Sequence, residues 1–363
     1  MSHVARLHLI AGAVMCLAFA PEYAARGEAG EGVPPASSSP NVSITGRECV
    51  ILVHGLMRRK SSLNTLERTL GVHGFDVANW DYLSTRQTIS ESADALYECY
   101  ELNARYHSKV HFVSHSLGGI VVRCMLKEHA VPKLGKIVML GPPNQGSAVA
   151  RTMLKGPLKW VAGPPGQELQ SKEYLERLCA VPKTGVLIIA GTKSFDYVNP
   201  VSYVSGVALE EPNDGTVSVK ETRLEGLPEP LQVKDSHTGL PNNPEVIKAV
   251  LDFLQDASTR EKEQSALEEG LRILRQDPGR VKDIISSLPS LPNVRTKTLG
   301  GKMFWADLVN VDGWRVQENV LLGNCRLLDP GNVRQAWGKK EDMVRAFEAV
   351  VAETRRSAAK PDR

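Results

Sequence analysis

Short apolar runs alternate with longer segments of helical periodicity between residues 47 and 257. Each short run predicts a buried strand. The runs lie near residues 48–53, 76–82, 110–115, 136–140, 185–191 and 231–234. Helical spacing of apolar residues is clearest over residues 91–106 and 245–255. Strands that alternate with helices in this way predict an α/β fold, with a mostly parallel central sheet covered on both faces.

The pattern changes in residues 258–363. A charged helical stretch over residues 258–276 precedes residues 302–329, which alternate like two or three short strands, and a helical segment follows over residues 341–356. This order predicts a small α+β module. Its three tryptophans are expected in the core of the module, although they could form a binding surface: Trp305, Trp314 and Trp337. The function and the partner of the module cannot be read from the pattern.

Residues 1–25 have the pattern of an export signal. Arg6 precedes an apolar run over residues 9–20, and Ala18 and Ala20 form an A-x-A cleavage site, although Pro21 would hinder cleavage there. The run is short for a membrane span. We therefore expect an exported protein (periplasmic, secreted or membrane-associated), with residues 26–46, rich in Gly, Pro and Ser, as a linker. An incorrectly assigned start codon would instead leave a cytoplasmic protein.

Length, charge and cysteine content limit the possible domain organisation and partners. With 363 residues the chain has room for one large domain, expected over 47–257, and the small module. A net charge of +3 without a long basic run makes nucleic acid an unexpected partner. The six cysteines lie far apart and form no C-x-x-C pair, so we expect core residues and neither a disulfide framework nor a zinc site.

Candidate chemistry begins at Ser116, in the stretch HFVSHSLGGIVVR over residues 111–123. The stretch passes from a strand pattern into a helix pattern at this serine. A sharp strand-to-helix turn needs small residues two positions before and after its centre, and Ser114 and Gly118 meet that need. The turn would expose the hydroxyl of Ser116 at a helix N-terminus, which favours developing negative charge. The alternative is a connection of small residues without chemistry.

A serine nucleophile requires a base and an acid that orients the base. In α/β enzymes with such a turn the acid and then the histidine follow the serine along the chain. His237 is preferred to His129, because only His237 also follows an aspartate after the serine. Asp214 is favoured as the acid, because Gly215 permits a tight turn that would hold its carboxylate. Asp196 is the alternative; Asp235 is too near His237 in sequence to reach the far side of its ring.

The oxyanion of a tetrahedral intermediate needs two N–H donors. The backbone N–H of Leu117, directly after the serine, is the first candidate. The second is the N–H of Leu56, since His54 and Gly55 end the strand CVILV and turn the chain there.

Together these residues resemble the lipase-like branch of the α/β-hydrolases. The motifs ILVHGL, FVSHSLGGIVVR, LGPPNQGS and EPNDGTV and the loop of His237 stand in the order of that family and cover about residues 47–257. The resemblance implies an esterase or lipase with Ser116 as nucleophile, Asp214 as acid and His237 as base, acting on an acyl ester or lipid-like substrate without a metal or organic cofactor. Ser114 departs from the family, which usually has glycine at this position.

Several alternatives share these residues. A thioesterase or an acyltransferase would use the same three side chains; a catalytically silent binding protein on the same fold is disfavoured, and a peptidase has no positive signal. Apolar residues between 148 and 178 could form a cap over an acyl chain, or could equally pack as core: Met153, Leu154, Leu158, Trp160 and Val161. Because the motifs end before residue 257, we expect a chain truncated there to retain activity on short esters.

Overall fold

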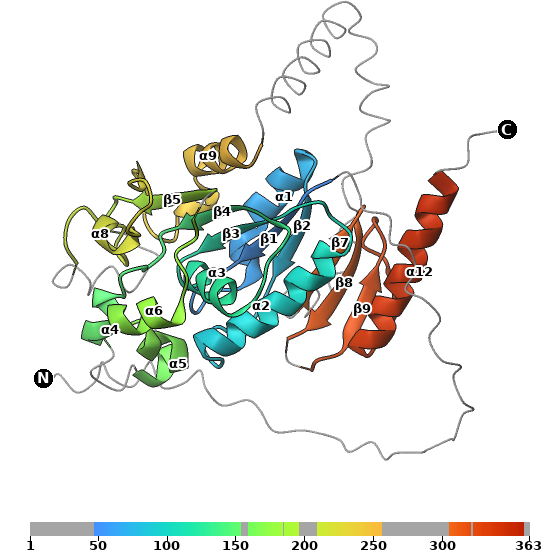
Figure 1. The fold of residues 1–363 in the computed structure, drawn as a ribbon, viewed down its shortest axis with the longest axis horizontal. Helices are drawn as coiled ribbons and strands as arrows, with labels where there is room; N and C mark the ends of the chain where they lie inside the picture. The colour runs from blue at the N-terminus through green and yellow to red at the C-terminus, as the bar shows by residue number, and fades with distance from the viewer. Residues whose placement is uncertain are drawn as a thin grey trace, which may run out of the picture. The chain divides into compact units, whose positions relative to one another are not determined.

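The computed structural model describes residues 47–153, 159–183, 185–195, 209–255, 305–320 and 322–358 (Figure 1). A six-stranded sheet has the order β2-β1-β3-β4-β5-β6, and every neighbouring pair is parallel. Its strands are β1 (Cys49–Val53), β2 (Asp76–Trp80), β3 (Val110–His115), β4 (Leu134–Leu140), β5 (Val186–Gly191) and β6 (Leu231–Val233). The predicted α/β class and the six predicted strands are confirmed.

Two hydrophobic cores lie on the two faces of this sheet. In β1 the side chains of Cys49, Ile51 and Val53 enter one core, and those of Val50 and Leu52 enter the other. Alternate side chains of a strand point to opposite faces, so a strand buried on both faces has a continuous apolar sequence. This explains the run CVILV.

Helices cover both faces of the sheet. The first core includes side chains of α2 (Ile89–Ala104) and α3 (Leu117–Glu128), and the second includes side chains of α1 (Asn64–Val72) and α9 (Pro244–Leu254). The predicted helices 91–106 and 245–255 correspond to α2 and α9. Among the described residues of this region, the other short helices are η1 (Lys60–Leu63), α4 (Ala148–Met153), α5 (Lys159–Glu168), α6 (Lys172–Leu178), α8 (Val219–Thr222) and η2 (Leu240–Asn242).

The C-terminal part is an antiparallel sheet of order β10-β9-β8-β7 with one long helix. Its elements are β7 (Trp305–Val311), β8 (Trp314–Asn319), β9 (Cys325–Leu328), β10 (Arg334–Gly338) and α12 (Lys340–Ala358). The α+β prediction is confirmed, with four strands where two or three were expected. Trp305 and Trp314 are partly buried, but Trp337 is 64 % exposed. The expectation that all three tryptophans are core residues is therefore wrong for Trp337.

The C-terminal part shares a core with the larger sheet. Leu102 and Tyr106, at the end of α2 and just beyond it, belong to the same cluster as Val309 and Phe347. Strand β7 also lies against β2, at the edge of the parallel sheet (Figure 1). The boundary expected at residue 257 falls in a segment outside the described residues, and the two sides of that boundary pack together.

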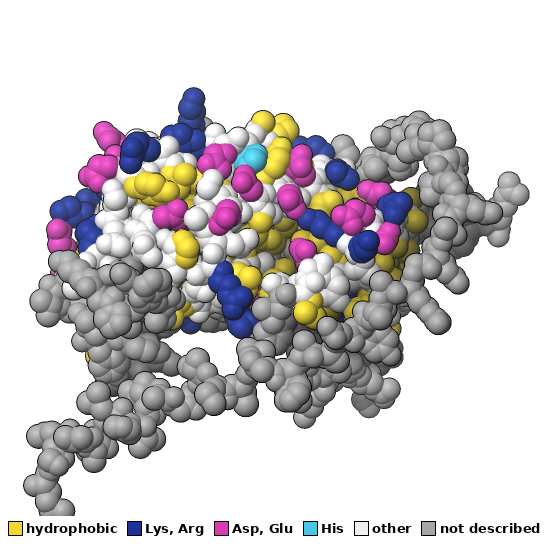
Figure 2. Space-filling view, turned by 90° about the horizontal axis from the view of Figure 1, so that it is seen from below, with side chains coloured by type: hydrophobic (Ala, Val, Ile, Leu, Met, Phe, Trp, Pro, Cys, Tyr) yellow, Lys and Arg dark blue, Asp and Glu magenta, His cyan; other side chains and the backbone are white. Residues whose placement is uncertain are grey.

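Some expectations fall on residues that the structure does not describe. These are the export signal, the linker, the helical stretch 258–276, Leu154, Leu158, and the side chains of Met153, Trp160 and Val161. In the part of the chain that is described, no helix is both long and apolar enough to cross a bilayer. On the face drawn in Figure 2, Lys and Arg side chains are interspersed with Asp and Glu.

Candidate active site

Ser116 lies at the turn between β3 and α3. Its backbone has φ 55° and ψ −124°, a left-handed region that residues other than glycine rarely adopt and that is costly to maintain. Its N–H donates to the carbonyl of Leu140 at the end of β4, at 2.8 Å. The serine itself remains partly exposed. The strained turn expected from the sequence is therefore present.

The small residues around Ser116 are required by close packing. A Cβ atom added at Gly118 would lie 2.4 Å from the carbonyl oxygen of Val53, and one added at Gly55 would lie 2.8 Å from Cβ of Ser116. Ser114 is fully buried, and its hydroxyl donates to the carbonyl of Val138 at 3.1 Å. The turn thus accommodates serine where the family usually has glycine, because the extra hydroxyl has a partner.

Asp214 and His237 form a buried pair. Oδ2 of Asp214 accepts from Nδ1 of His237 at 2.7 Å, while Oδ1 accepts from the N–H groups of Thr216 and Val217 at 2.9 and 2.7 Å. The N–H of His237 also donates to the carbonyl of Asp214 at 2.9 Å. With its proton on Nδ1, a neutral imidazole ring carries a lone pair on Nε2, which is the arrangement a general base needs.

The end of β4 brings this pair to the serine. Leu140 accepts the hydrogen bond from Ser116, and the next residue, Gly141, has φ 54°. A Cβ atom on Gly141 would lie 3.0 Å from Nδ1 of His237 and 3.1 Å from Oδ2 of Asp214. The last residue of β4 therefore binds the serine backbone, and the residue after it lies beside the Asp214–His237 pair.

His115 is a site residue that the sequence analysis did not identify. Its Nε2 donates to the carbonyl of His237 at 2.9 Å, and the two rings are 4.7 Å apart. Burial, followed by the proximity of His237, holds the pKa of His115 well below its ordinary value, so the ring is neutral. His115 thus ties the loop of His237 to the residue before Ser116. A buried histidine in a strand carries no sequence signal for this role.

The other candidate residues have different surroundings. Asp235 accepts from the N–H of Ser236 at 2.7 Å and from the amide of Asn243 at 2.8 Å, so it shapes the loop of His237. His129 lies at the other end of α3 from Ser116, with Nε2 2.7 Å from Oδ1 of Asp94. Twelve residues of helix separate it from the serine, or about 18 Å. Asp196 lies outside the described residues.

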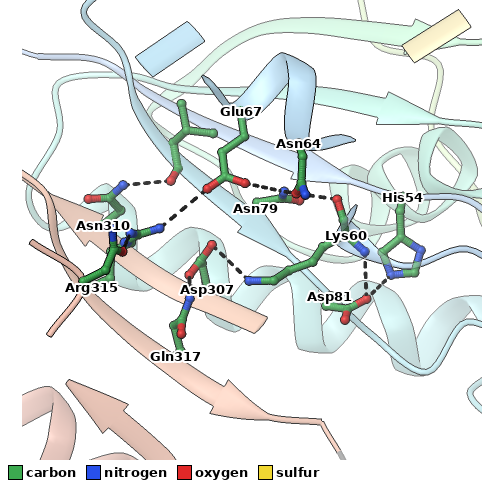
Figure 3. A network of polar contacts seen from close by, with 12 residues as sticks. His54, Lys60, Asn64, Glu67, Asn79, Asp81, Asp307, Asn310, Arg315 and Gln317 are labelled. Carbon is green, nitrogen blue, oxygen red and sulfur yellow. Dashed lines mark hydrogen bonds and ion pairs between the residues drawn. The ribbon is translucent and has the colours of Figure 1, made fainter. Parts of the chain in front are cut away.

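The predicted oxyanion donors flank Ser116. Leu117 is the first residue of α3, where a backbone N–H has no partner within the helix. Leu56 follows β1 in a loop that Gly55 presses against Ser116. Residues beside β2 hold this loop, because Nε2 of His54 lies 2.6 Å from Oδ1 of Asp81 (Figure 3) and Ser84 Oγ accepts from the N–H of Met57 at 3.1 Å.

Two further features lie apart from the serine. The carboxylates of Asp94 and Glu128 and the ring of His129 come together on the surface, a grouping that is common without a metal ion. A cavity of 810 Å³ opens beside α8 and is lined by charged residues of both signs, among them Arg151 and Glu221. Ser116, Asp214 and His237 do not line it, and nothing about its lining assigns it a ligand.

Known proteins resemble this chain in structure but not detectably in sequence family. No protein-family model and no curated protein sequence matches the chain. Solved structures that resemble it include the Bacillus licheniformis lipase BlEst2 in its mature form, with 22% identity over 60% of this chain and 96% of that chain and a TM-score of 0.48. The Legionella pneumophila phospholipase PlaB has 22% identity over 48% of this chain and 44% of that chain, with a TM-score of 0.40. A metagenomic carboxyl esterase, MGS0156, has 18% identity over 58% and 70% of the two chains, with a TM-score of 0.43.

These neighbours are lipases and esterases, as the sequence motifs predicted. Identity and TM-score this low carry no conclusion about activity, so the assignment of a reaction depends on the geometry of this chain.

Proposed function

We propose that the chain is a serine hydrolase that cleaves carboxylic esters through an acyl-enzyme intermediate. One observation carries the proposal: Leu140, the last residue of β4, accepts the N–H of Ser116, and the next residue, Gly141, lies so near the Asp214–His237 pair that an added Cβ would be 3.0 Å from Nδ1 of His237. A strained serine at a helix N-terminus, next to a histidine whose Nδ1 is held by a carboxylate, has the three parts that nucleophilic acyl transfer needs.

In the first half of the reaction, Nε2 of His237 takes the proton of Ser116 as Oγ attacks the ester carbonyl. The Asp214 carboxylate stabilises the imidazolium that forms. The N–H groups of Leu56 and Leu117 donate to the oxyanion of the tetrahedral intermediate. This intermediate collapses as the C–O bond breaks, and the departing alcohol takes the proton from His237.

In the second half, His237 takes a proton from water as the water oxygen attacks the acyl-serine carbonyl. The second tetrahedral intermediate releases the acid and returns the proton to Oγ of Ser116. These steps require no metal or organic cofactor. We further propose an acyl ester or lipid-like substrate and an exported protein, the latter from the pattern of residues 1–25.

A panel of short and long p-nitrophenyl esters, thioesters and amides tests this proposal. We expect ester hydrolysis by the full chain and its loss, by many orders of magnitude, in Ser116→Ala with an unchanged circular dichroism spectrum. Hydrolysis by Ser116→Ala within tenfold of wild type would overturn the assignment. Preferred cleavage of thioesters, or acyl transfer to an added alcohol in place of water, would favour the thioesterase or acyltransferase alternative, and no turnover of any substrate would favour the silent binding protein.

A further inference from the structure

A buried lysine joins the C-terminal sheet to the loop beside Ser116. Lys60, the first residue of η1, is only 6 % exposed, and its Nζ lies 3.5 Å from Oδ2 of the fully buried Asp307 on β7 (Figure 3). Removing a charge from water is costly unless a partner of opposite charge is held close to it. The position of Lys60 therefore depends on a residue of the C-terminal sheet.

The carboxylate of Asp307 is itself held firmly. Its Oδ1 accepts from the side-chain amide of Gln317, and Oε1 of Gln317 accepts from Nε of Arg326 at 2.9 Å. Burial raises the pKa of the Asp307 carboxyl, but the charges of Lys60 and Arg315, together with the hydrogen bonds from Gln317 and Lys60, hold this pKa below its ordinary value. Asp307 is thus an anion whose carboxylate is held by hydrogen bonds on β7.

From Lys60 the contacts continue to the peptide group that carries the Leu56 N–H. The N–H of Lys60 donates to Oδ1 of Asp81 at 3.2 Å, and the same oxygen lies 2.6 Å from Nε2 of His54. Nδ1 of His54 donates to the carbonyl of Gly55 at 2.9 Å. In a planar trans peptide the C=O and N–H point in opposite directions. The hydrogen bond to the Gly55 carbonyl therefore sets the direction of the Leu56 N–H.

We propose that the C-terminal sheet orients one oxyanion donor of the active site, through Asp307, Lys60, Asp81 and His54 as positioning residues. The inference rests on the proposed function, because it gives the Leu56 N–H a role in the reaction. It also changes the expectation for truncation: a chain that ends at residue 257 lacks both Asp307 and the β7 strand that carries it, so Lys60 loses the partner that holds it in place. Such a chain is expected to hydrolyse even short esters poorly.

The expected effect is on turnover and not on substrate binding. An oxyanion donor interacts with charge that develops in the transition state, so its misalignment lowers kcat with little change in KM. Loss of a whole donor costs about 10²–10³ in kcat, and a misdirected donor retains part of that contribution. We therefore expect Lys60→Met to lower kcat by about 10–100-fold.

The experiment measures kcat and KM on a short p-nitrophenyl ester, the rate of fluorophosphonate labelling and Tm, all in the full chain. Asn310→Ala is the matched control: Nδ2 of Asn310 donates to the carbonyl of Val77 at 2.9 Å, across the same interface but away from the loop (Figure 3). If Lys60→Met fails to fold, Asp307→Asn replaces it, since it keeps the volume and one acceptor oxygen; a loss of about 3–10-fold in kcat is then expected.

We expect Lys60→Met, or Asp307→Asn in its place, to lower kcat and the labelling rate at nearly constant KM. Asn310→Ala should keep kcat and the labelling rate of wild type at a comparable loss of Tm. Equal loss of kcat in both variants would reduce the contact to a purely structural role and overturn the inference. A wild-type kcat in folded Lys60→Met, or in Asp307→Asn where that variant replaces it, would also overturn the inference, without affecting the proposed function. A wild-type chain that neither hydrolyses esters nor reacts with the fluorophosphonate would overturn the proposed function, and this inference with it.

Discussion

Asp214→Asn should reverse the hydrogen bond that orients His237. In wild type, Oδ1 of Asp214 accepts from two backbone N–H groups and Oδ2 accepts from Nδ1 of His237. The oxygen of an asparagine will remain facing the two N–H groups, because turning its amide toward them would leave two donors unpaired, and the buried one at Val217 alone would cost about 1–3 kcal/mol. The NH₂ group must then occupy the position of Oδ2.

This rearrangement fixes the wrong tautomer of the ring. An NH₂ group 2.7 Å from Nδ1 can be accommodated only if Nδ1 accepts, which places the ring proton on Nε2 and removes the lone pair that would take the proton of Ser116. The corresponding change in the serine-protease template lowers kcat by about 10⁴, equivalent to about 5.5 kcal/mol of transition-state stabilisation. We expect a loss of that size in kcat, with KM little changed.

Steady-state kinetics on one short p-nitrophenyl ester measure this loss, with Tm as the check on folding. Asp252→Asn makes the same chemical change in α9, where the exposed carboxylate pairs with Lys248 one helical turn away, and should leave kcat near wild type. A kcat for a folded Asp214→Asn within tenfold of wild type would refute the reasoning and make Asp196 the next candidate for the acid.

Two further predictions concern stability. Gly118→Ala should lower Tm and ester hydrolysis together, because its Cβ would meet the carbonyl of Val53 at 2.4 Å. Gly71→Ala in α1, where a Cβ meets no atom within 4 Å, should instead raise the free energy of unfolding by about 0.5–1 kcal/mol. Equal Tm values for the two variants would contradict this. The hydrogen bond from His111 is the main cause that lowers the pKa of Glu48 from 4.5 to about 2. The ionised Glu48 carboxylate therefore stabilises the folded state fully above about pH 4.5, and this stabilisation is lost as the pH falls toward 2. Glu48→Gln should therefore lower the urea midpoint at about pH 6 but have little effect at about pH 2, and a difference that is independent of pH would disprove this origin.

The parallel sheet was predictable because its strands are buried on both faces. A run such as CVILV can be continuously apolar only where both sides are covered, and helices with one apolar side supply that cover. Ser116 was predictable for a related reason. Its turn requires small neighbours, and the sequence has Ser114 and Gly118 at the two positions concerned.

The contacts that complete the site were less accessible to prediction. His115 reaches the carbonyl of His237 across 122 residues of sequence, and Lys60 reaches Asp307 across 247. Neither pair has a fixed spacing or a local motif, because each depends on how separate elements pack. Lys60 in particular has the sequence context of an exposed loop residue, MRRKSS, and only the packing of β7 against the edge of the parallel sheet buries its charge.

Fluorophosphonate labelling followed by intact-mass and peptide mass spectrometry tests the central claim most directly. The reagent forms a stable covalent bond with a serine oxygen only when an adjacent base activates the hydroxyl and donors stabilise the charge on phosphorus-bound oxygen. Our account predicts a single adduct on the peptide that contains Ser116, absent in Ser116→Ala and formed much more slowly in Asp214→Asn. An unlabelled wild-type chain, or an adduct that persists unchanged in Ser116→Ala, would contradict the assignment of Ser116 as the nucleophile.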